Sequence, residues 1–275
     1  MKQRIPTIGV FDSGVGGLTV LAALLKQASA ANYLYLGDTA RLPYGSKSRV
    51  TVARYAVSSA RFLVEQGAEA LVIACNTASA LALDALRSAV EVPVIGVIET
   101  GATAALASSQ TKDVMVIATA ATVESHAYSA ACRERGLRAV EKACPLLVPL
   151  VEEGWIEHPV TREVAAIYLD DLLAQSAAGG MASDTLVLGC THYPLLRPVI
   201  EETLRQHTDG RKVRVIDSAH VTAEQVAVRL ALENHAGRES EVRFYATDSV
   251  AKFRALGTRF LGREIDGVEL IDLGG

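Results

Sequence analysis

The chain has 275 residues, half of them apolar, with a formal net charge of −4 and only 5% aromatic residues. It has neither the basic surface nor the stacking side chains of a nucleic-acid-binding protein, so nucleic acid is not expected as a partner. No run of about 18 apolar residues occurs, and the sequence therefore predicts no membrane span.

The N-terminal segment meets an acid at Asp12 before the apolar core of a signal peptide can develop, so we expect a cytoplasmic protein. Its length allows one large domain or two ordinary ones. None of the four cysteines has CxxC spacing, and we expect reduced thiols at Cys75, Cys132, Cys144 and Cys190.

The first predicted elements are a strand at Ile5–Phe11, a glycine-rich turn at Asp12–Gly17 and a helix at Leu18–Gln27. Such a turn presents backbone N–H groups at a helix N-terminus, where an anion such as a carboxylate or phosphate can bind. A tight turn without a ligand is the plainer interpretation.

The same turn partly matches a dinucleotide-binding fingerprint. Gly14 and Gly16 have the spacing of its first two glycines, and Asp38, after a predicted strand at Tyr33–Gly37, could bind a ribose. The position of the last glycine is occupied by Thr19, so the match is incomplete.

A thiol, an amide and a hydroxyl follow the next predicted strand. A polar loop at Pro43–Gly45 and a helix at Arg49–Gln66 precede a short apolar strand at Ala70–Ala74. Cys75-Asn76-Thr77 comes directly after it, and a helix begins within a few residues. In open α/β sheets, ligands bind at the carboxyl ends of strands, so this tripeptide is a candidate site.

The chain repeats this pattern. Further strands are predicted at Val92–Ile98, Asp113–Ala118 and Arg138–Ala143, and then Thr185–Gly189 is followed by Cys190-Thr191-His192 and a helix opening near Pro194. Alternating strands and helices predict parallel-rich α/β architecture. Because the cysteine unit occurs twice, we expect two similar α/β lobes, with the active site in the cleft between them.

Several chemistries could use these cysteines. His192 could join both as a zinc ligand, although tight CxxC pairs are absent. Either thiol could be a nucleophile with His192 as base, but consecutive loop residues usually diverge, and one cysteine would have no role. A two-lobed binding protein would need neither thiol.

Proton transfer uses both thiols. Inverting a carbon acid requires a base on one face and an acid on the other, and the two exchange roles when the reaction reverses. An unperturbed thiol has a pKa of about 8.5, and we expect the helix N-termini after Cys75 and Cys190 to lower it. Asp12 and His192 could each assist one thiol.

Four motifs carry a family resemblance: DSGVGGLTV at 12–20, PYG at 43–45, ACNTASA at 74–80 and GCTHYPLL at 189–196. In this order, over nearly the whole chain, they resemble the glutamate racemases of the cofactor-independent Asp/Glu racemase superfamily. The resemblance implies two α/β domains related by pseudo-twofold symmetry, with the second inserted into the first. We expect the first to comprise residues 1–98 and 212–275, and the second residues 99–211.

The resemblance also implies the roles of individual residues. Cys75 would deprotonate D-glutamate with support from Asp12, and Cys190 would deprotonate L-glutamate with support from His192. The implied substrate-binding residues are Asp12, Ser13, Tyr44, Gly45, Asn76, Thr77, Thr191 and His192, together with Thr119, Thr122 and Glu152. A homodimer that makes D-glutamate for peptidoglycan, without a cofactor or metal, is implied as well.

Overall fold

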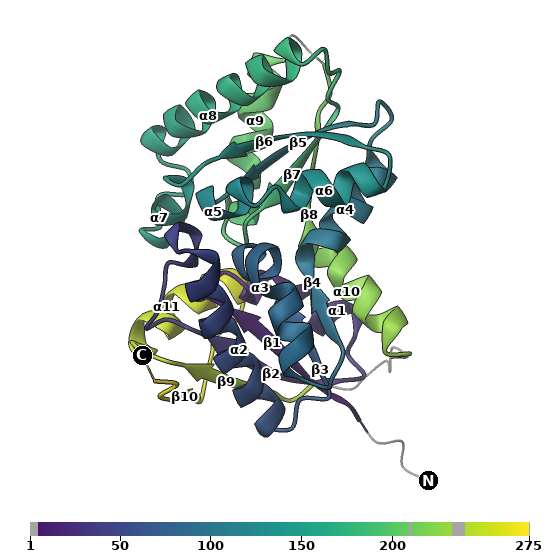
Figure 1. Cartoon of the computed structure of the whole chain (residues 1–275). Helices are drawn as coiled ribbons and strands as arrows, with labels where there is room; N and C mark the ends of the chain where they lie inside the picture. The colour runs from purple at the N-terminus through teal and green to yellow at the C-terminus, as the bar shows by residue number, and fades with distance from the viewer. Residues whose placement is uncertain (1–4, 209–210, 233–239, 275) are drawn as a thin grey trace. The chain divides into compact units, whose positions relative to one another are not determined.

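The computed structural model describes residues 5–208, 211–232 and 240–274. The chain divides into two compact units, and each is described by itself (Figure 1). Unit 1 comprises Met1–Val97 and Ala219–Gly275, and unit 2 comprises Ile98–Ser218.

Unit 1 is built on a parallel sheet with the strand order β10-β9-β2-β1-β3-β4. Its strands are β1 (Thr7–Asp12), β2 (Asn32–Gly37), β3 (Ala70–Ile73), β4 (Val94–Gly96), β9 (Val242–Ala246) and β10 (Val268–Leu270). All four residues of β3 are buried. A continuous apolar run of this kind is typical of a parallel strand covered on both faces.

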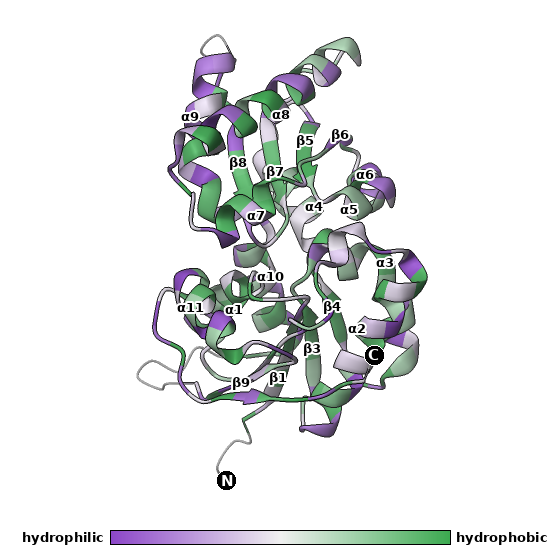
Figure 2. Cartoon of the chain, turned by 90° about the vertical axis from the view of Figure 1, so that its left-hand side faces the viewer, coloured by the Kyte–Doolittle hydropathy of each residue, from purple (hydrophilic) through white to green (hydrophobic). Residues whose placement is uncertain are grey.

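Helices cover both faces of this sheet. Figure 2 shows α1 and α11 on one side of it and α2 and α3 on the other. The helical segments of this part of the chain are α1 (Leu18–Gln27), η1 (Tyr44–Ser46), α2 (Arg49–Glu65), α3 (Asn76–Ala89), α10 (Ser218–Arg229) and α11 (Val250–Leu261).

Unit 2 has a smaller parallel sheet with the order β6-β5-β7-β8. Its strands are β5 (Asp113–Ala118), β6 (Arg138–Ala143), β7 (Thr185–Gly189) and β8 (Arg214–Asp217). Its helical segments are α4 (Val97–Ser108), α5 (Ala120–Glu124), α6 (Ala127–Glu134), α7 (Leu147–Glu152), α8 (Pro159–Ala178), η2 (Tyr193–Leu196) and α9 (Arg197–His207). Figure 2 shows α9 on one side of the sheet and α5 and α6 on the other.

The two sheets share one topology, which confirms the predicted pair of similar α/β folds. In each, the first strand lies between the second and the third, and the fourth follows the third: 2-1-3-4 in unit 1 and 6-5-7-8 in unit 2. Strand β8 pairs with β7. Ile98 and residues 212–218, predicted to belong to the first domain, lie with unit 2.

Two predicted segments differ from the structure. The strand predicted at Val92–Ile98 is limited to Val94–Gly96, because α4 already begins at Val97. For Pro145–Trp155 the sequence predicts an irregular segment, whereas the structure has helix α7 at Leu147–Glu152.

Candidate active site

The predicted site residues of unit 1 gather at the carboxyl edge of its sheet. The chain leaves β1 toward β2 and then returns past β1 to β3, so the strand order reverses between β1 and β3. Ligands bind at such a switch point in open α/β sheets. Asp12 ends β1, and Cys75 lies just beyond β3. The unit 1 cluster is defined here as Asp12, Ser13, Cys75, Asn76 and Thr77.

Cys75 is a buried thiol that also caps a helix. Its Sγ lies 3.5 Å from Oγ of Ser13, to which the thiol donates. The same sulfur accepts the backbone N–H of Ala78 at 3.4 Å, so Cys75 is the N-cap of α3. Asn76 and Thr77 open this helix and are buried beside the thiol position.

The pKa of Cys75 is raised to about 12, first by burial and then by the negative charge of Asp12. Hydrogen bonds from Ser13 and Ala78 lower it by less. The expectation that the helix N-terminus would lower this pKa is therefore wrong for Cys75. Loss of water around the sulfur outweighs the three hydrogen bonds that favour the thiolate, from the side chain and backbone of Ser13 and the backbone of Ala78.

The glycine-rich turn fixes the carboxylate of Asp12. This side chain is 1% exposed, and its Oδ2 accepts the backbone N–H of Gly14 at 2.9 Å. A Cβ on Gly17 would lie 2.5 Å from Cβ of Asp12 and 2.9 Å from Cβ of Ala74. The turn was predicted to bind an anion through its backbone N–H groups. The N–H of Gly14 binds a carboxylate that belongs to the chain itself, that of Asp12.

Tyr44 and Gly45 lie in η1, after the loop that follows β2. The hydroxyl of Tyr44 donates to the carboxylate of Asp38, which Arg41 also contacts. Protein donors therefore surround the acid that the dinucleotide interpretation assigned to a ribose. Burial and the nearby charge of Asp38 raise the pKa of Tyr44 well above its usual range.

Unit 2 places its own residues at the equivalent edge. The order of its strands reverses between β5 and β7, and Cys190 follows β7 directly. The Sγ of Cys190 lies 3.9 Å from Nδ1 of His192, and Oγ1 of Thr191 lies 3.4 Å from the same nitrogen. All three side chains are buried. The unit 2 cluster is defined here as Thr119, Thr122, Glu152, Cys190, Thr191 and His192.

Glu152 extends this arrangement. It ends α7, and its Oε1 lies 3.3 Å from Nε2 of His192. When Nε2–H donates to this carboxylate, Nδ1 can accept a proton from the thiol. The expectation that His192 and Cys190 would diverge is therefore wrong, because both ring nitrogens are held, one toward the sulfur and one toward Glu152.

Two threonines complete the unit 2 cluster. Thr119 precedes α5 as its N-cap residue, and its Oγ1 lies 2.9 Å from Oγ1 of Thr122. Thr119 follows β5, the strand beside β7, so it reaches the same sheet edge as Cys190.

The sheet registers make the two cysteines equivalent. Phe11 pairs with Ile73, and Cys75 comes two residues after Ile73. Ile117 pairs with Leu188, and Cys190 comes two residues after Leu188. Both thiols therefore occupy the same position beyond the third strand of their fold.

This equivalence extends to the hydroxyl neighbours. Two residues beyond Phe11 is Ser13, whose hydroxyl contacts Cys75, and two residues beyond Ile117 is Thr119. In each unit, a hydroxyl residue just beyond the first strand thus lies level with the thiol just beyond the third strand.

The charged neighbours are not equivalent. The position of Asp12 in unit 1 is taken by Ala118 in unit 2, and the position of His192 in unit 2 is taken by Thr77 in unit 1. Each thiol therefore has one ionisable neighbour that the other unit lacks: a carboxylate near Cys75 and an imidazole near Cys190.

Metal sites and membrane spans are both absent from the part of the chain that the structure describes. No group of three or more His, Cys, Asp or Glu residues within 5–208, 211–232 and 240–274 has the geometry of a metal site. In the same residues, no helix combines the length and the apolar character needed to cross a membrane.

The fold and the two clusters define an α/β protein with two parallel sheets and a buried thiol at the carboxyl edge of each. Residues 8–226 match the family model described as Asp/Glu/Hydantoin racemase. A glutamate racemase of Koribacter versatilis (strain Ellin345) is 50% identical, with 100% of both chains covered. The chain belongs to this racemase family, whose members are cofactor-independent isomerases.

Solved structures agree with this assignment. The chain is similar to the glutamate racemase of Francisella tularensis subsp. tularensis SCHU S4 in complex with D-glutamate, with a TM-score of 0.85, 35% identity and 98% of each chain covered. It is also similar to the enzyme of Thermus thermophilus in complex with beta-chloro-D-alanine, with a TM-score of 0.83, 42% identity and 98% of each chain covered.

Proposed function

We propose that this protein interconverts L- and D-glutamate, with Cys75 and Cys190 as the two proton carriers. The observation that carries the proposal is the equivalence of the two cysteines in the two sheets. A chain that repeats a thiol at one topological position has the two acid–base groups that inversion of a carbon acid needs. Relatives named glutamate racemase support glutamate as the substrate.

The proton balance is simple. From L-glutamate, the thiolate of Cys190 removes the α-proton on one face, and the thiol of Cys75 gives a proton to the opposite face. From D-glutamate, Cys75 is the base and Cys190 the acid. The raised pKa of Cys75 keeps it a thiol at neutral pH, as its acid role requires, and makes its thiolate a stronger base in the reverse direction.

In this scheme Asp12 and His192 each assist one of the two thiols. Asp12 supports Cys75, because its charge strengthens that thiolate as a base. His192, held by Glu152, supports Cys190, because its Nδ1 can exchange a proton with the sulfur. We assign the remaining members of both clusters, with Tyr44 and Gly45, to substrate binding.

The biological setting belongs to the same proposal. D-glutamate made by this enzyme would enter peptidoglycan, and the enzyme would act as a cytoplasmic homodimer. All four cysteines are free thiols, which fits a reducing compartment.

The direct test is a circular-dichroism assay of L-glutamate and L-aspartate with no added cofactor. We expect racemisation of glutamate, unaffected by EDTA, with kcat/KM at least about tenfold above that for aspartate, which is about 1.4 kcal/mol of discrimination. Equal rates on the two amino acids would contradict the substrate assignment. Activity that EDTA removes and zinc restores would contradict the thiol mechanism.

Substitutions test the two thiols. Cys75→Ala and Cys190→Ala should each reduce kcat by at least about a thousandfold, and the double variant should lose little more, because both carriers serve one reaction. Cys132→Ala is the matched control: this buried thiol lies in α6 and belongs to neither cluster, and its loss should leave kcat unchanged. Near-normal turnover by either single variant would refute the two-base scheme.

A further inference from the structure

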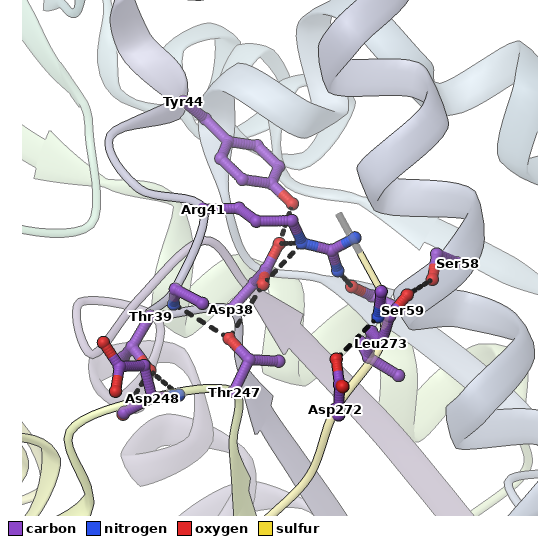
Figure 3. Close-up of polar contacts among 12 residues, drawn as sticks. Asp38, Thr39, Arg41, Tyr44, Ser58, Ser59, Thr247, Asp248, Asp272 and Leu273 are labelled. Atoms are coloured by element: carbon purple, nitrogen blue, oxygen red, sulfur yellow. Dashed lines mark hydrogen bonds and ion pairs between the residues drawn. The ribbon is translucent and has the colours of Figure 1, made fainter.

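Asp38 is the centre of a buried polar cluster at the carboxyl end of β2 (Figure 3). Its side chain is fully buried. Nε of Arg41 lies 2.9 Å from Oδ1 and 2.8 Å from Oδ2, and Oγ1 of Thr247 donates to Oδ1 at 2.9 Å. The hydroxyl of Tyr44 donates to Oδ2. Three donor groups thus converge on one carboxylate.

These donors come from segments that are far apart in the sequence. Thr247 follows β9, and its Oγ1 also accepts the backbone N–H of Ala40 at 2.9 Å. The cluster therefore ties the loop after β2 to the loop after β9. The backbone N–H of Asp38 donates to the carbonyl of Asp12 at 3.0 Å, which fixes the carboxylate close to the end of β1.

Arg41 supplies the charge that balances Asp38. Its side chain is 9% exposed and lies with its guanidinium 4.6 Å from the ring centroid of Tyr55. One of its nitrogens donates to Oγ of Ser59 at 3.4 Å. The ion pair is therefore packed against α2 and held in one geometry, and the charge on Asp38 is stabilised although the side chain is buried.

The hydroxyl of Tyr44 is bound by Asp38, and its ring packs against other aromatic rings. It is 1% exposed and contacts the rings of Phe11 and Tyr55, with centroid distances of 6.1 and 6.0 Å. Contacts between tilted aromatic rings restrain sliding of a ring in its own plane only weakly. A hydrogen bond to a charged acceptor is stronger and has a defined direction. The hydrogen bond to Asp38 therefore fixes the depth at which the side chain of Tyr44 is buried in unit 1.

The backbone of Tyr44 begins η1, and its carbonyl accepts the N–H of Lys47 at 3.0 Å. The residue that is bound to Asp38 through its hydroxyl therefore also closes the turn through its carbonyl. We propose that Asp38 is a positioning residue for racemisation, acting through Tyr44 to hold the Tyr44-Gly45 turn in its substrate-binding shape. This inference rests on the proposed function, in which Tyr44 and Gly45 contact glutamate.

Asp38 itself makes no contact with substrate in this scheme, because it is fully buried and its oxygens are engaged by protein donors. Its loss should affect binding rather than proton transfer. A contact made equally in the ground state and the transition state changes KM and leaves kcat in place.

The test uses Asp38→Asn and Tyr44→Phe in the full chain. Tyr44→Phe keeps the ring contacts and removes only the bond to Asp38. We expect each variant to raise KM for glutamate about tenfold, with kcat within about twofold of the original, as loss of a hydrogen bond to a charged group predicts. Because both remove the same bond, the double variant should raise KM no more than the stronger single variant does.

Tyr33→Phe is the matched control. Tyr33 lies near the start of β2, the strand that Asp38 follows. It is fully buried, and its hydroxyl donates to the carbonyl of Ala28 at 2.6 Å. The control should lower the melting temperature without changing KM. If Tyr44→Phe also lowered only the melting temperature, Asp38 would have a purely structural role and the inference would be overturned.

Two further outcomes are separable. Circular dichroism shows whether Asp38→Asn folds. If it does not, the KM of Tyr44→Phe alone tests the positioning role, because this variant leaves the Asp38–Arg41 ion pair intact. If the unaltered protein does not racemise glutamate, the proposed function has failed. If it does and Tyr44→Phe keeps its KM, only the positioning role has failed.

Discussion

The thiol of Cys75 has neighbours with opposing effects on its ionisation. Burial and the charge of Asp12 raise its pKa to about 12, whereas the hydrogen bond with Ser13 lowers it. Since alkylation needs the thiolate, its rate at a fixed pH reports this balance.

We therefore predict opposite effects from two neighbouring substitutions. Asp12→Asn should lower the pKa of Cys75 and speed its alkylation by iodoacetamide at pH 8, while Ser13→Ala should raise the pKa and slow it. The measurement is the pH dependence of modification of the Cys75 peptide, followed by mass spectrometry. Shifts in the same direction for both variants would show that access, and not charge, controls the reaction.

Asp12 and His192 occupy positions that are not equivalent in the two units, so the proposed mechanism gives each a different proton transfer. The enantiomers have equal free energy, and kcat/KM must stay equal in the two directions whatever is substituted. A preference for one face must instead appear in which transfer limits the rate.

Isotope effects can therefore assign the two residues. Asp12→Asn should raise the barrier for transfer at Cys75, so the primary isotope effect on kcat/KM should grow with α-deuterated D-glutamate and shrink with α-deuterated L-glutamate. His192→Asn should reverse both trends. If both variants shifted the two effects alike, Asp12 and His192 would be positioning groups for substrate, with no separate thiol partners.

The turn between β1 and α1 contains glycines with different spatial demands. A Cβ on Gly17 would meet short, rigid side chains, those of Asp12 at 2.5 Å and Ala74 at 2.9 Å. At Gly14 the nearest atom is the flexible end of Leu42 at 3.4 Å. Neither glycine has a positive φ, so the two positions differ only in the room they leave for a Cβ atom.

Gly17→Ala should therefore displace Asp12 or the end of β3, with a loss of about 1–3 kcal/mol of stability and a clear fall in kcat/KM. Gly14→Ala should be tolerated within about 0.5 kcal/mol. Thermal melting and the racemase assay check both variants. Equal tolerance at the two positions would mean that the helix start can shift without disturbing Asp12.

Most strands and helices were predictable because each is a local pattern. Fully buried strands such as Thr185–Gly189 read as short apolar runs ended by polar residues. The prediction failed where local signals conflict with packing. Val97 continues an apolar run, but its N–H is bound by Oγ of Ser79 at 3.2 Å and the chain turns into α4. The segment Pro145–Trp155 lacks a clear periodic pattern, yet it contains α7, and Pro149 lies in the first turn of this helix, where its missing N–H is tolerated.

The site was predictable to the extent that polar residues follow strands. That logic found Cys75 and Cys190, but it could not give the pKa of Cys75, which depends on burial by the whole unit. Nor could it find the role of Asp38. One of its partners, Thr247, is 209 residues away and comes from a strand that only the sheet order brings beside β2.

At the level of the whole chain, one topology occurs in both units and carries one thiol in each. In both sheets the first strand lies between the second and the third, and in both a thiol comes two residues after the third-strand partner of a first-strand residue, Ile73 in unit 1 and Leu188 in unit 2. The different residues at the positions of Asp12 and His192 make the two thiols chemically distinct, although their positions are equivalent.

The chain also buries many weakly acidic side chains. Burial is the main reason why five of its eight tyrosines have pKa values raised well above 10.0: Tyr33, Tyr35, Tyr44, Tyr128 and Tyr193. It also raises the pKa of Cys75 to about 12 and that of Cys132 to about 11. All of these groups hold their protons in the native state at neutral pH.

This predicts loss of stability in alkali. Below the unfolded pKa values of 9.0 for cysteine and 10.0 for tyrosine, both states are protonated and the contribution is fully present. Above them, the unfolded chain releases protons that the native state retains, so the free energy of unfolding falls by about 1.4 kcal/mol per pH unit for each proton released.

Urea unfolding from pH 8 to 11 should show this decline, and tyrosinate absorbance should rise together with unfolding. Tyr33→Phe should make the decline shallower, because one fewer proton is released. A midpoint that stayed constant to pH 11 would mean that these hydroxyls and thiols ionise within the native structure.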